Sequence, residues 1–199
     1  MLQNINIIIG KYLLSFFYYK DIILDTINLA NLNKYFKSAR QGDPKAQYNL
    51  GYCYQYGQGV GKDYNKAFEW YYKSANNGCA LGQYYLGNCY CYGRGTTHDY
   101  NKAFEWYFKS ANNKYALGQK SLGYCYEKGI GTEKDSNKAF KWYFKSANNG
   151  CGLGQFHLGY CYHYGVGTNI NIKEAVIWYK KSSDNGIVRA NIMLKHYVK

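Results

Sequence analysis

Four tryptophans recur along this chain at one constant spacing. Trp70, Trp106, Trp142 and Trp178 each stand 36 residues from the next, without an insertion or a deletion. The residues around them recur as well, so the 199-residue chain is an array of one small unit. Such a period is typical of solenoids, in which each unit packs only against its neighbours and the stack builds an extended binding surface.

The recurring segments divide the chain into four full units and shorter pieces at both ends. Residues 26–42 keep the register of the second half of a unit, but Lys34 replaces the tryptophan, as expected of a terminal repeat. The apolar residues 1–25 are expected to form a helical cap; a signal peptide is the alternative, and the uninterrupted apolar stretch is too short for a membrane span. The full units are 43–78, 79–114, 115–150 and 151–186, and residues 187–199 form a C-terminal half-unit.

The first half of each unit has the pattern of a helix. Leu50, Gly51, Cys53 and Tyr54 recur at i, i+1, i+3 and i+4, which makes one helical stripe and does not alternate as a strand would. A glycine inside a helix costs about 1 kcal/mol relative to alanine, so its recurrence at position 51 indicates close contact with a neighbouring helix. Gly57 is expected to end the helix in a left-handed cap. The G-x-G pairs lack the spacing of a phosphate loop.

The second half of each unit predicts another helix. Asp63 and its equivalents are suited to cap the helix start, and Lys73 and its equivalents stand near its end, where positive charge complements the helix dipole. An apolar stripe that includes Trp70 follows a period of 3.6 residues, and we expect each tryptophan to lie inside the stack. Each unit is therefore a helical hairpin, and the predicted fold is an all-α solenoid of helix-turn-helix repeats.

The units resemble Sel-1-like repeats, which are related to the tetratricopeptide repeat. The resemblance spans residues 43–193 and rests on Ala46-Gln47-x-x-Leu50-Gly51-x-x-Tyr54, Gly57-x-Gly59-Val60, Asp63-x-x-Lys66-Ala67-x-x-Trp70-Tyr71 and Ala75. The fourth unit departs from it at Asn171, Glu174 and Ser183. The resemblance implies a right-handed α/α superhelix, no catalytic residues, and an adaptor or scaffold role beside signalling or protein-quality-control partners.

The cysteines and the resemblance both bear on the compartment. Cys53 and its equivalents fall on the helical stripe, and neighbours in that column should stand roughly 9–10 Å apart, too far for a disulfide. They are expected to act as small buried hydrophobes. Some secreted members of the family that these units resemble carry a disulfide in every unit. The matching sites are Ala75 and Gln83 here, so that pattern is absent. We therefore predict a reducing, cytoplasmic compartment and disfavour secretion.

The net charge of +13 leaves a second function class open. A basic chain suits nucleic acid or an anionic surface. However, the lysines are spread along the chain, and Glu69–Lys73 and Glu105–Lys109 have the i,i+4 spacing of surface ion pairs. A solvated basic surface is therefore the preferred interpretation, and a nucleic-acid or anionic-surface binder stays as the alternative.

The binding face is predicted from the positions that vary between units. Positions 45, 49, 52 and 56 share one face of the first helix, and tyrosine is frequent there. Aromatic anchors dominate interface energies, so this face, expected to be concave, is predicted to bind a protein or a peptide. The alternative is that these tyrosines pack between neighbouring helices. The candidate residues are Tyr52, Tyr56, Tyr85, Asn88, Tyr92, Tyr124, Lys128, His157, Tyr160 and Tyr164.

Other chemistry has little support in the sequence. His157 and His163 do not share a helix face, and Cys89-x-Cys91 lacks the second half of a zinc site. No Ser/His/Asp arrangement or carboxylate pair stands out. We predict a monomeric scaffold with no enzymatic activity, no cofactor, no metal and no small-molecule substrate. A fragment of a larger signalling protein is a further alternative.

Overall fold

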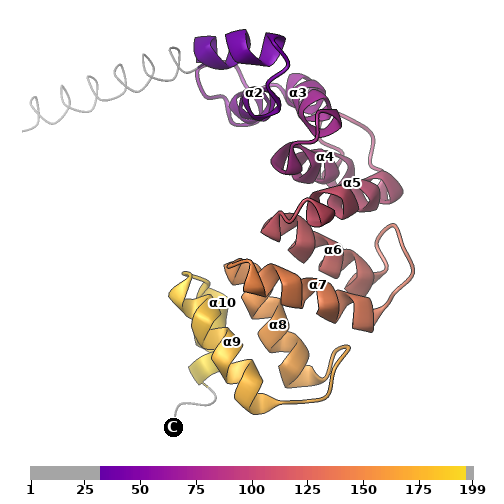
Figure 1. Cartoon of the computed structure of the whole chain (residues 1–199), viewed down its shortest axis with the longest axis vertical. Coiled ribbons are helices and arrows are strands. Elements are labelled where there is room, and N and C mark those ends of the chain that lie inside the picture. Colours follow the sequence, from indigo (N-terminus) through magenta and orange to yellow (C-terminus); the bar gives the residue numbers. More distant parts are fainter. Residues whose placement is uncertain (1–31, 196–199) are drawn as a thin grey trace, which may run out of the picture.

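The computed structural model describes residues 32–195, and within this range the regular elements are all helices (Figure 1). The predicted all-α solenoid is confirmed. The predicted N-terminal cap of residues 1–25 lies outside the described residues. A helix over residues 32–40 comes first. It is followed by α2 (Pro44–Tyr56), α3 (Tyr64–Asn76), α4 (Ala80–Tyr92), α5 (Tyr100–Asn112), α6 (Ala116–Lys128), α7 (Ser136–Asn148), α8 (Gly152–Tyr164), α9 (Ile172–Asp184) and α10 (Val188–Lys195).

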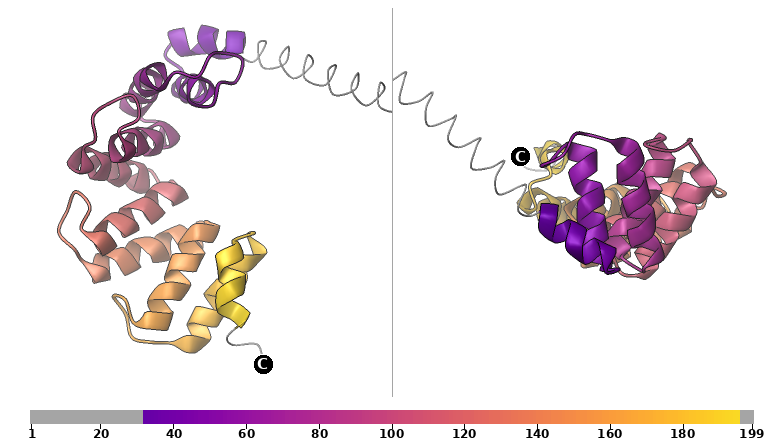
Figure 2. Two further views of the ribbon diagram at one scale, coloured as in Figure 1. Left: turned by 180° about the vertical axis from the view of Figure 1, so that it is seen from behind. Right: turned by 90° about the horizontal axis from the view of Figure 1, so that it is seen from above.

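The helices pair into four hairpins, and the hairpins stack into an arc (Figure 1). The first helices, α2, α4, α6 and α8, contact one another in sequence, and each also packs against the second helix of its own repeat. Seen from behind, the same arc opens toward the opposite side of the view (Figure 2). The long turns that join α6 to α7 and α8 to α9 project from the outer edge of the arc (Figure 1).

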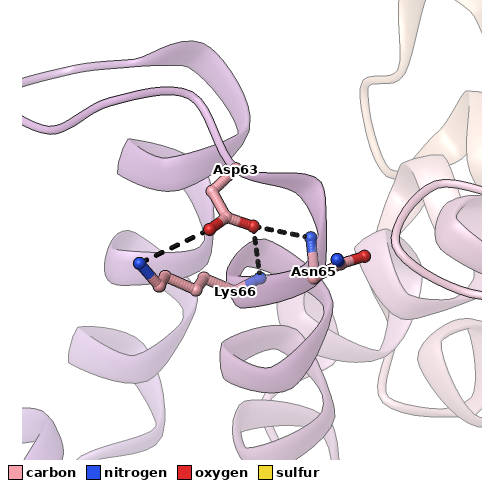
Figure 3. Close-up of polar contacts among 3 residues, drawn as sticks. All are labelled: Asp63, Asn65 and Lys66. Atoms are coloured by element: carbon pink, nitrogen blue, oxygen red, sulfur yellow. Dashed lines mark hydrogen bonds and ion pairs between the residues drawn. The ribbon is translucent and has the colours of Figure 1, made fainter.

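The helix ends follow the sequence signals. Gly57 adopts a left-handed conformation, with φ 73°, directly after α2, and its amide donates to the carbonyl of Cys53. Asp63 begins α3: its carboxylate accepts hydrogen bonds from the amides of Asn65 and Lys66, both at 3.0 Å, and pairs with the Lys66 ammonium at 3.4 Å (Figure 3). The predicted caps at Asp99 and Asp135 accept in the same way. These bonds satisfy amides that a helix start leaves free.

The glycine inside each first helix marks the closest approach within a hairpin. A Cβ placed on Gly87 would lie 2.7 Å from the Tyr107 ring of the second helix. A Cβ placed on Gly51 would likewise lie 2.6 Å from the Tyr71 ring. The predicted helix contact is therefore confirmed, and its partner is the tyrosine that follows the tryptophan.

The tryptophans are less buried than the sequence predicted. Trp106 and Trp178 are buried, but Trp70 and Trp142 are only half-buried, so the prediction is wrong for these two. Each ring lies under the ammonium of the lysine three residues later; the distances to the ring centroid are 3.9–4.4 Å. The tryptophans lie at the edge of the core, where the lysines cover them. The fully buried aromatic side chains are Tyr71, Tyr143 and Tyr179.

The lysine positions also correct the predicted ion pairs. Among the described residues, no ion pair joins Glu69 to Lys73 or Glu105 to Lys109. Lys73 and Lys109 lie over the tryptophan rings instead, 4.4 and 3.9 Å from the centroids. A cation over an indole face gains about 0.5–1 kcal/mol at an exposed site, as much as an exposed i,i+4 ion pair or more.

Recurring polar side chains join helices both within a repeat and between neighbouring repeats. The Gln83 amide donates to the carbonyl of Ala75 in the preceding repeat, at 3.3 Å, and its oxygen accepts from Asn113 at 2.9 Å. The Ser110 hydroxyl donates to the carbonyl of Ala80 at 2.7 Å. Equivalent bonds recur in the other repeats. These recurring polar positions therefore hold the hairpins and the stack together and are not free for a ligand.

The terminal half-units cover the two ends of the stack. Leu32 and Ala39 of the 32–40 helix form a buried cluster with Leu50 of α2. At the other end, Ala190 of α10 packs with Ala175 and Tyr179 of α9. Each end thus adds one helix of a hairpin to the array.

The cysteines are free thiols. The column of Cys53, Cys89, Cys125 and Cys161 is buried, as predicted. Burial raises the pKa of the Cys89, Cys125 and Cys161 thiols to about 12. These thiols stay protonated and act as small apolar side chains.

Candidate interaction surface

The ten candidate residues all lie on the first helices of the repeats, and they differ in exposure. One set is half-buried: Tyr52, Tyr85, Asn88, His157 and Tyr160. The other set is exposed: Tyr56, Tyr92, Tyr124, Lys128 and Tyr164, of which the tyrosines are between 40 and 62% exposed. The exposed set is concentrated in the last turn of each first helix.

The half-buried tyrosines of the first two repeats pack between helices. The Tyr85 ring stacks on Tyr71 and contacts Tyr48, each with a centroid distance of 5.2 Å. Burial, more than any neighbour, raises the pKa of Tyr85 and Tyr48, so both phenols are neutral near pH 7. Tyr52 extends this cluster outward to Tyr56, whose ring centroid is 4.4 Å away. For Tyr85 the packing interpretation therefore holds, and Tyr56 is the accessible end of the cluster.

Asn88 is occupied by a structural hydrogen bond. The hydroxyl of Tyr107, the buried tyrosine of the second helix, donates to its side-chain oxygen at 2.7 Å. In repeats one and three the equivalent hydroxyls donate to Gln55, at 3.1 Å, and Glu127, at 2.7 Å, which both stand three residues further along the first helix. Some variation between repeats therefore reflects different ways to satisfy one buried hydroxyl, which the comparison of repeats alone does not reveal.

Polar and charged side chains gather in the third and fourth repeats. Glu127 accepts the Tyr143 hydroxyl at 2.7 Å and pairs with the Lys128 ammonium at 2.6 Å. Burial alone would raise the pKa of Glu127, but the hydrogen bonds from Lys128 and Tyr143 bring it below its ordinary value. His157 stacks on Tyr143 with a centroid distance of 4.7 Å. Burial lowers the pKa of His157 to about 4, and Lys120 acts in the same direction.

A hollow of about 620 Å³ opens beside this cluster. Glu127, Lys128 and Tyr160 line it from the first helices, and the turn after α8, at Gly167 and Thr168, closes another side. Two of the ten candidate residues thus border a cavity with charged and polar walls. The ring centroid of the neighbouring Tyr164 lies 4.5 Å from that of Tyr160.

One column of this surface was missed by the sequence reasoning. Tyr48 and its equivalents Tyr84, Lys120 and Phe156 are half-buried, and the three aromatic members contact candidate residues. Their identity differs between repeats, and this variation was available as a signal. Burial lowers the pKa of Lys120, the one cation in the column.

Across residues 32–195 there is no cluster of three or more histidine, cysteine or acidic side chains that could hold a metal ion. None of the described helices is both long enough and apolar enough to span a membrane.

The sequence of the four hairpins matches a known family model. The Sel1 repeat model matches residues 44–79, 80–115, 116–151 and 152–187. The chain belongs to the Sel1 repeat family. The matched segments cover the whole array of full hairpins and therefore include all ten candidate residues. Sel1 repeats generally mediate protein–protein interactions. No curated protein matches the chain significantly.

Solved structures of Sel1-like proteins are similar to this one. A protective antigen of uropathogenic Escherichia coli that displays an SLR fold is 32% identical, with a TM-score of 0.76 over 87% of this chain. A Sel1 repeat protein from Oxalobacter formigenes is 34% identical, with a TM-score of 0.70 over 77% of this chain. This chain spans only 40% and 63% of the lengths of those two proteins. Cysteine rich protein B of Helicobacter pylori is 28% identical, with a TM-score of 0.54; the match covers 67% of this chain and 96% of that one.

Proposed function

We propose that this Sel1 repeat chain is a non-catalytic scaffold or adaptor that binds a protein segment or a peptide on its first-helix layer. The observation that carries the proposal is a row of exposed side chains at one repeat position, in the last turn of each first helix. The row consists of Tyr56, Tyr92, Lys128 and Tyr164. Successive first helices contact one another, which supports the proposal that the members of the row act as one surface.

The exposed rings are held in place before a partner binds. Tyr56 packs on Tyr52, and Tyr164 packs on Tyr160, with centroid distances of 4.4 and 4.5 Å. Rings that are already fixed lose little conformational freedom on binding, and tyrosine contributes large contact area. The repeated rings thus suit an extended partner that meets several repeats at once.

The proposal is tested by selecting peptides from a displayed random library on the immobilised chain. Peptides enriched on the wild type are then measured by fluorescence anisotropy against the double variant Tyr56→Ala/Tyr92→Ala. The matched control is Tyr100→Ala, which removes a ring that is 47% exposed on the second helix α5. We expect the double variant to bind at least about tenfold more weakly, as loss of aromatic anchors does, and the control to bind normally.

Two results would overturn the assignment. If the double variant loses helicity in circular dichroism, its tyrosines serve the fold and the surface is misplaced. If the control weakens binding as much as the double variant, the contact face is elsewhere. A nucleic-acid or anionic-surface binder, the competing hypothesis, would instead bind polyanions with an affinity that falls steeply as salt rises.

The cellular setting belongs to the same proposal. The family resemblance favours a partner in signalling or protein quality control. Seven free cysteines support a reducing, cytoplasmic compartment. We also propose that the chain acts as a monomer, which sedimentation at several concentrations would test.

A further inference from the structure

A second surface lies on the second helices, around α7. A hollow of about 480 Å³ is lined by the rings of Phe140, Trp142 and Phe144. Phe144 is 42% exposed, and Trp142 is half-buried. The hollow is separate from the row of exposed tyrosines described above, because its main wall is the second helix of the third repeat.

Three lysines of α7 stand at the rim of this hollow. Lys145 lies over the Trp142 ring at 4.0 Å, and Lys138 pairs with Asp135 at 3.2 Å. Lys141 is exposed, and among the described residues no acidic side chain pairs with it. The rim therefore carries positive charge that is only partly compensated within the chain.

An adjoining hollow of about 490 Å³ shares Trp142, Phe144 and Lys145 with the first and extends to Lys114. Lys114 has φ 60°, and it is the one residue other than glycine with a positive φ among the described residues. Gly78 and Gly150 take the same place in their repeats. A Cβ at either glycine would meet open space, so the lysine fits sterically, but its backbone conformation is strained for a residue with a side chain.

Two departures from the repeat pattern thus meet at one place. Lys141 stands where the first two repeats have Glu69 and Glu105, and Lys114 stands where other repeats have glycine. Relative to the first repeat, these changes raise the net charge of the paired hollows by three: two from glutamate to lysine and one from glycine to lysine. The other repeats form the same hairpins without either lysine, so the fold does not require them.

We propose that these paired hollows, which we call the basic groove, bind an acidic peptide segment that carries apolar anchor side chains. The basic groove consists of Lys114, Lys138, Lys141, Trp142, Phe144 and Lys145. Its rings would take the anchors, and its ammonium groups would pair with flanking carboxylates. A hollow of this size suits single side chains better than a nucleic-acid backbone, which needs a stripe of cations. This second site goes beyond the proposed function, since it would hold a different partner segment.

The test uses the full chain and a fluorescein-labelled synthetic peptide in which a central Leu-Phe pair is flanked on both sides by aspartates and glutamates. Lys141→Glu restores the residue type of the first two repeats, so it should fold normally. The matched control, Lys62→Glu, makes the same change of net charge on an exposed turn of the first repeat. We expect Lys141→Glu to weaken binding about tenfold, and Lys62→Glu by less than about twofold.

A second variant separates binding from folding. Lys114→Gly removes the strained conformation, so it should raise or preserve the melting temperature while it weakens peptide binding several-fold. If Lys114 served the fold instead, Lys114→Gly would lower the melting temperature. The double variant Lys114→Gly/Lys141→Glu should bind more weakly than either single variant and still fold.

Three results would overturn the proposal. Equal losses in Lys141→Glu and Lys62→Glu would show that only the net charge matters. Unchanged affinity for a peptide with Ala-Ala in place of Leu-Phe would show that the rings take no anchor. Tighter binding of single-stranded oligonucleotides or phosphatidylserine vesicles, lost in Lys141→Glu, would assign the basic groove to nucleic acid or membrane instead.

Discussion

Replacing Gly87 by alanine sets two opposing effects against each other. Alanine in a helix interior is favoured over glycine by about 1 kcal/mol, so helix propensity alone predicts a more stable protein. The structure predicts the reverse. The added Cβ would lie 2.7 Å from the Cδ1 and Cε1 atoms of Tyr107, 0.7 Å short of the 3.4 Å at which ordinary contact begins.

The Tyr107 ring has little room to give way. It is only 4% exposed, and its hydroxyl donates to Asn88 at 2.7 Å, so displacement of the ring would also strain this bond. Overpacking costs about 1–3 kcal/mol, and a weakened hydrogen bond adds about 0.5–1.5 kcal/mol. After the propensity gain, we expect Gly87→Ala to lower the free energy of unfolding by about 1–3 kcal/mol.

Urea denaturation followed by circular dichroism measures this change. Gly61→Ala is the matched control, because a Cβ there meets nothing within 4 Å; its effect should be close to zero or stabilising. In a double-mutant cycle, Tyr107→Leu should cost less in the Gly87→Ala background than in the wild type, since the clash is then removed. A Gly87→Ala protein at least as stable as the wild type would refute the steric reasoning.

Three further predictions concern pH and the tryptophans. The pKa of His157 is about 4, below its ordinary 6.5, so the native state favours the neutral ring. The neutral ring's contribution to stability is therefore present above pH 6.5 and is lost as the pH falls toward 4. His157→Tyr should flatten that part of the curve of melting temperature against pH. The backbone hydrogen bond from Lys102 lowers the pKa of Asp99 below 3.8, so its capping contribution is lost as the pH falls below that value. Asp99→Asn should keep the cap and remove this acid dependence. Trp106→Ala should cost about 3–5 kcal/mol in urea denaturation, and Trp142→Ala clearly less, because its ring is half-buried.

Each of these three predictions has an outcome that would contradict it. An unchanged slope between pH 6.5 and 4 in His157→Tyr would place the titration on another group, of which Glu127 is an acidic candidate whose charge also acts on His157. An Asp99→Asn protein with the acid sensitivity of the wild type would exclude the cap as its source. Equal losses at the two tryptophans would contradict the difference in their burial.

Much of the fold could be predicted because the repeat shows the same local signals several times. One aspartate before a helical pattern is a weak sign of a cap, but Asp63, Asp99 and Asp135 at one position are strong evidence, and all three cap a helix. The recurring glycine at position 51 predicted a close helix contact in the same way. Repetition thus acts as a comparison within a single chain.

The candidate surface was predicted less completely, because variation between repeats has more than one cause. The repeat position of Asn88 varies because Asn88 satisfies the Tyr107 hydroxyl in its own repeat. The position of Tyr85 varies because Tyr85 fills space between helices. Tyr56 and Tyr92 vary on an exposed surface. Sequence spacing places all four on the first helices, but their exposure depends on the neighbouring repeat.

The sequence by itself determined the period, the helices, their caps and the family, since these depend on contacts within about one hairpin. The tertiary structure alone decided which side chains are accessible, because neighbouring repeats cover some of them, as where Tyr48 of the first repeat contacts Tyr85 of the second. It decided that Trp70 and Trp142 stay half-buried under lysines while the following tyrosines form the core. It also brought Lys114 and Lys141, which belong to different repeats, to one groove.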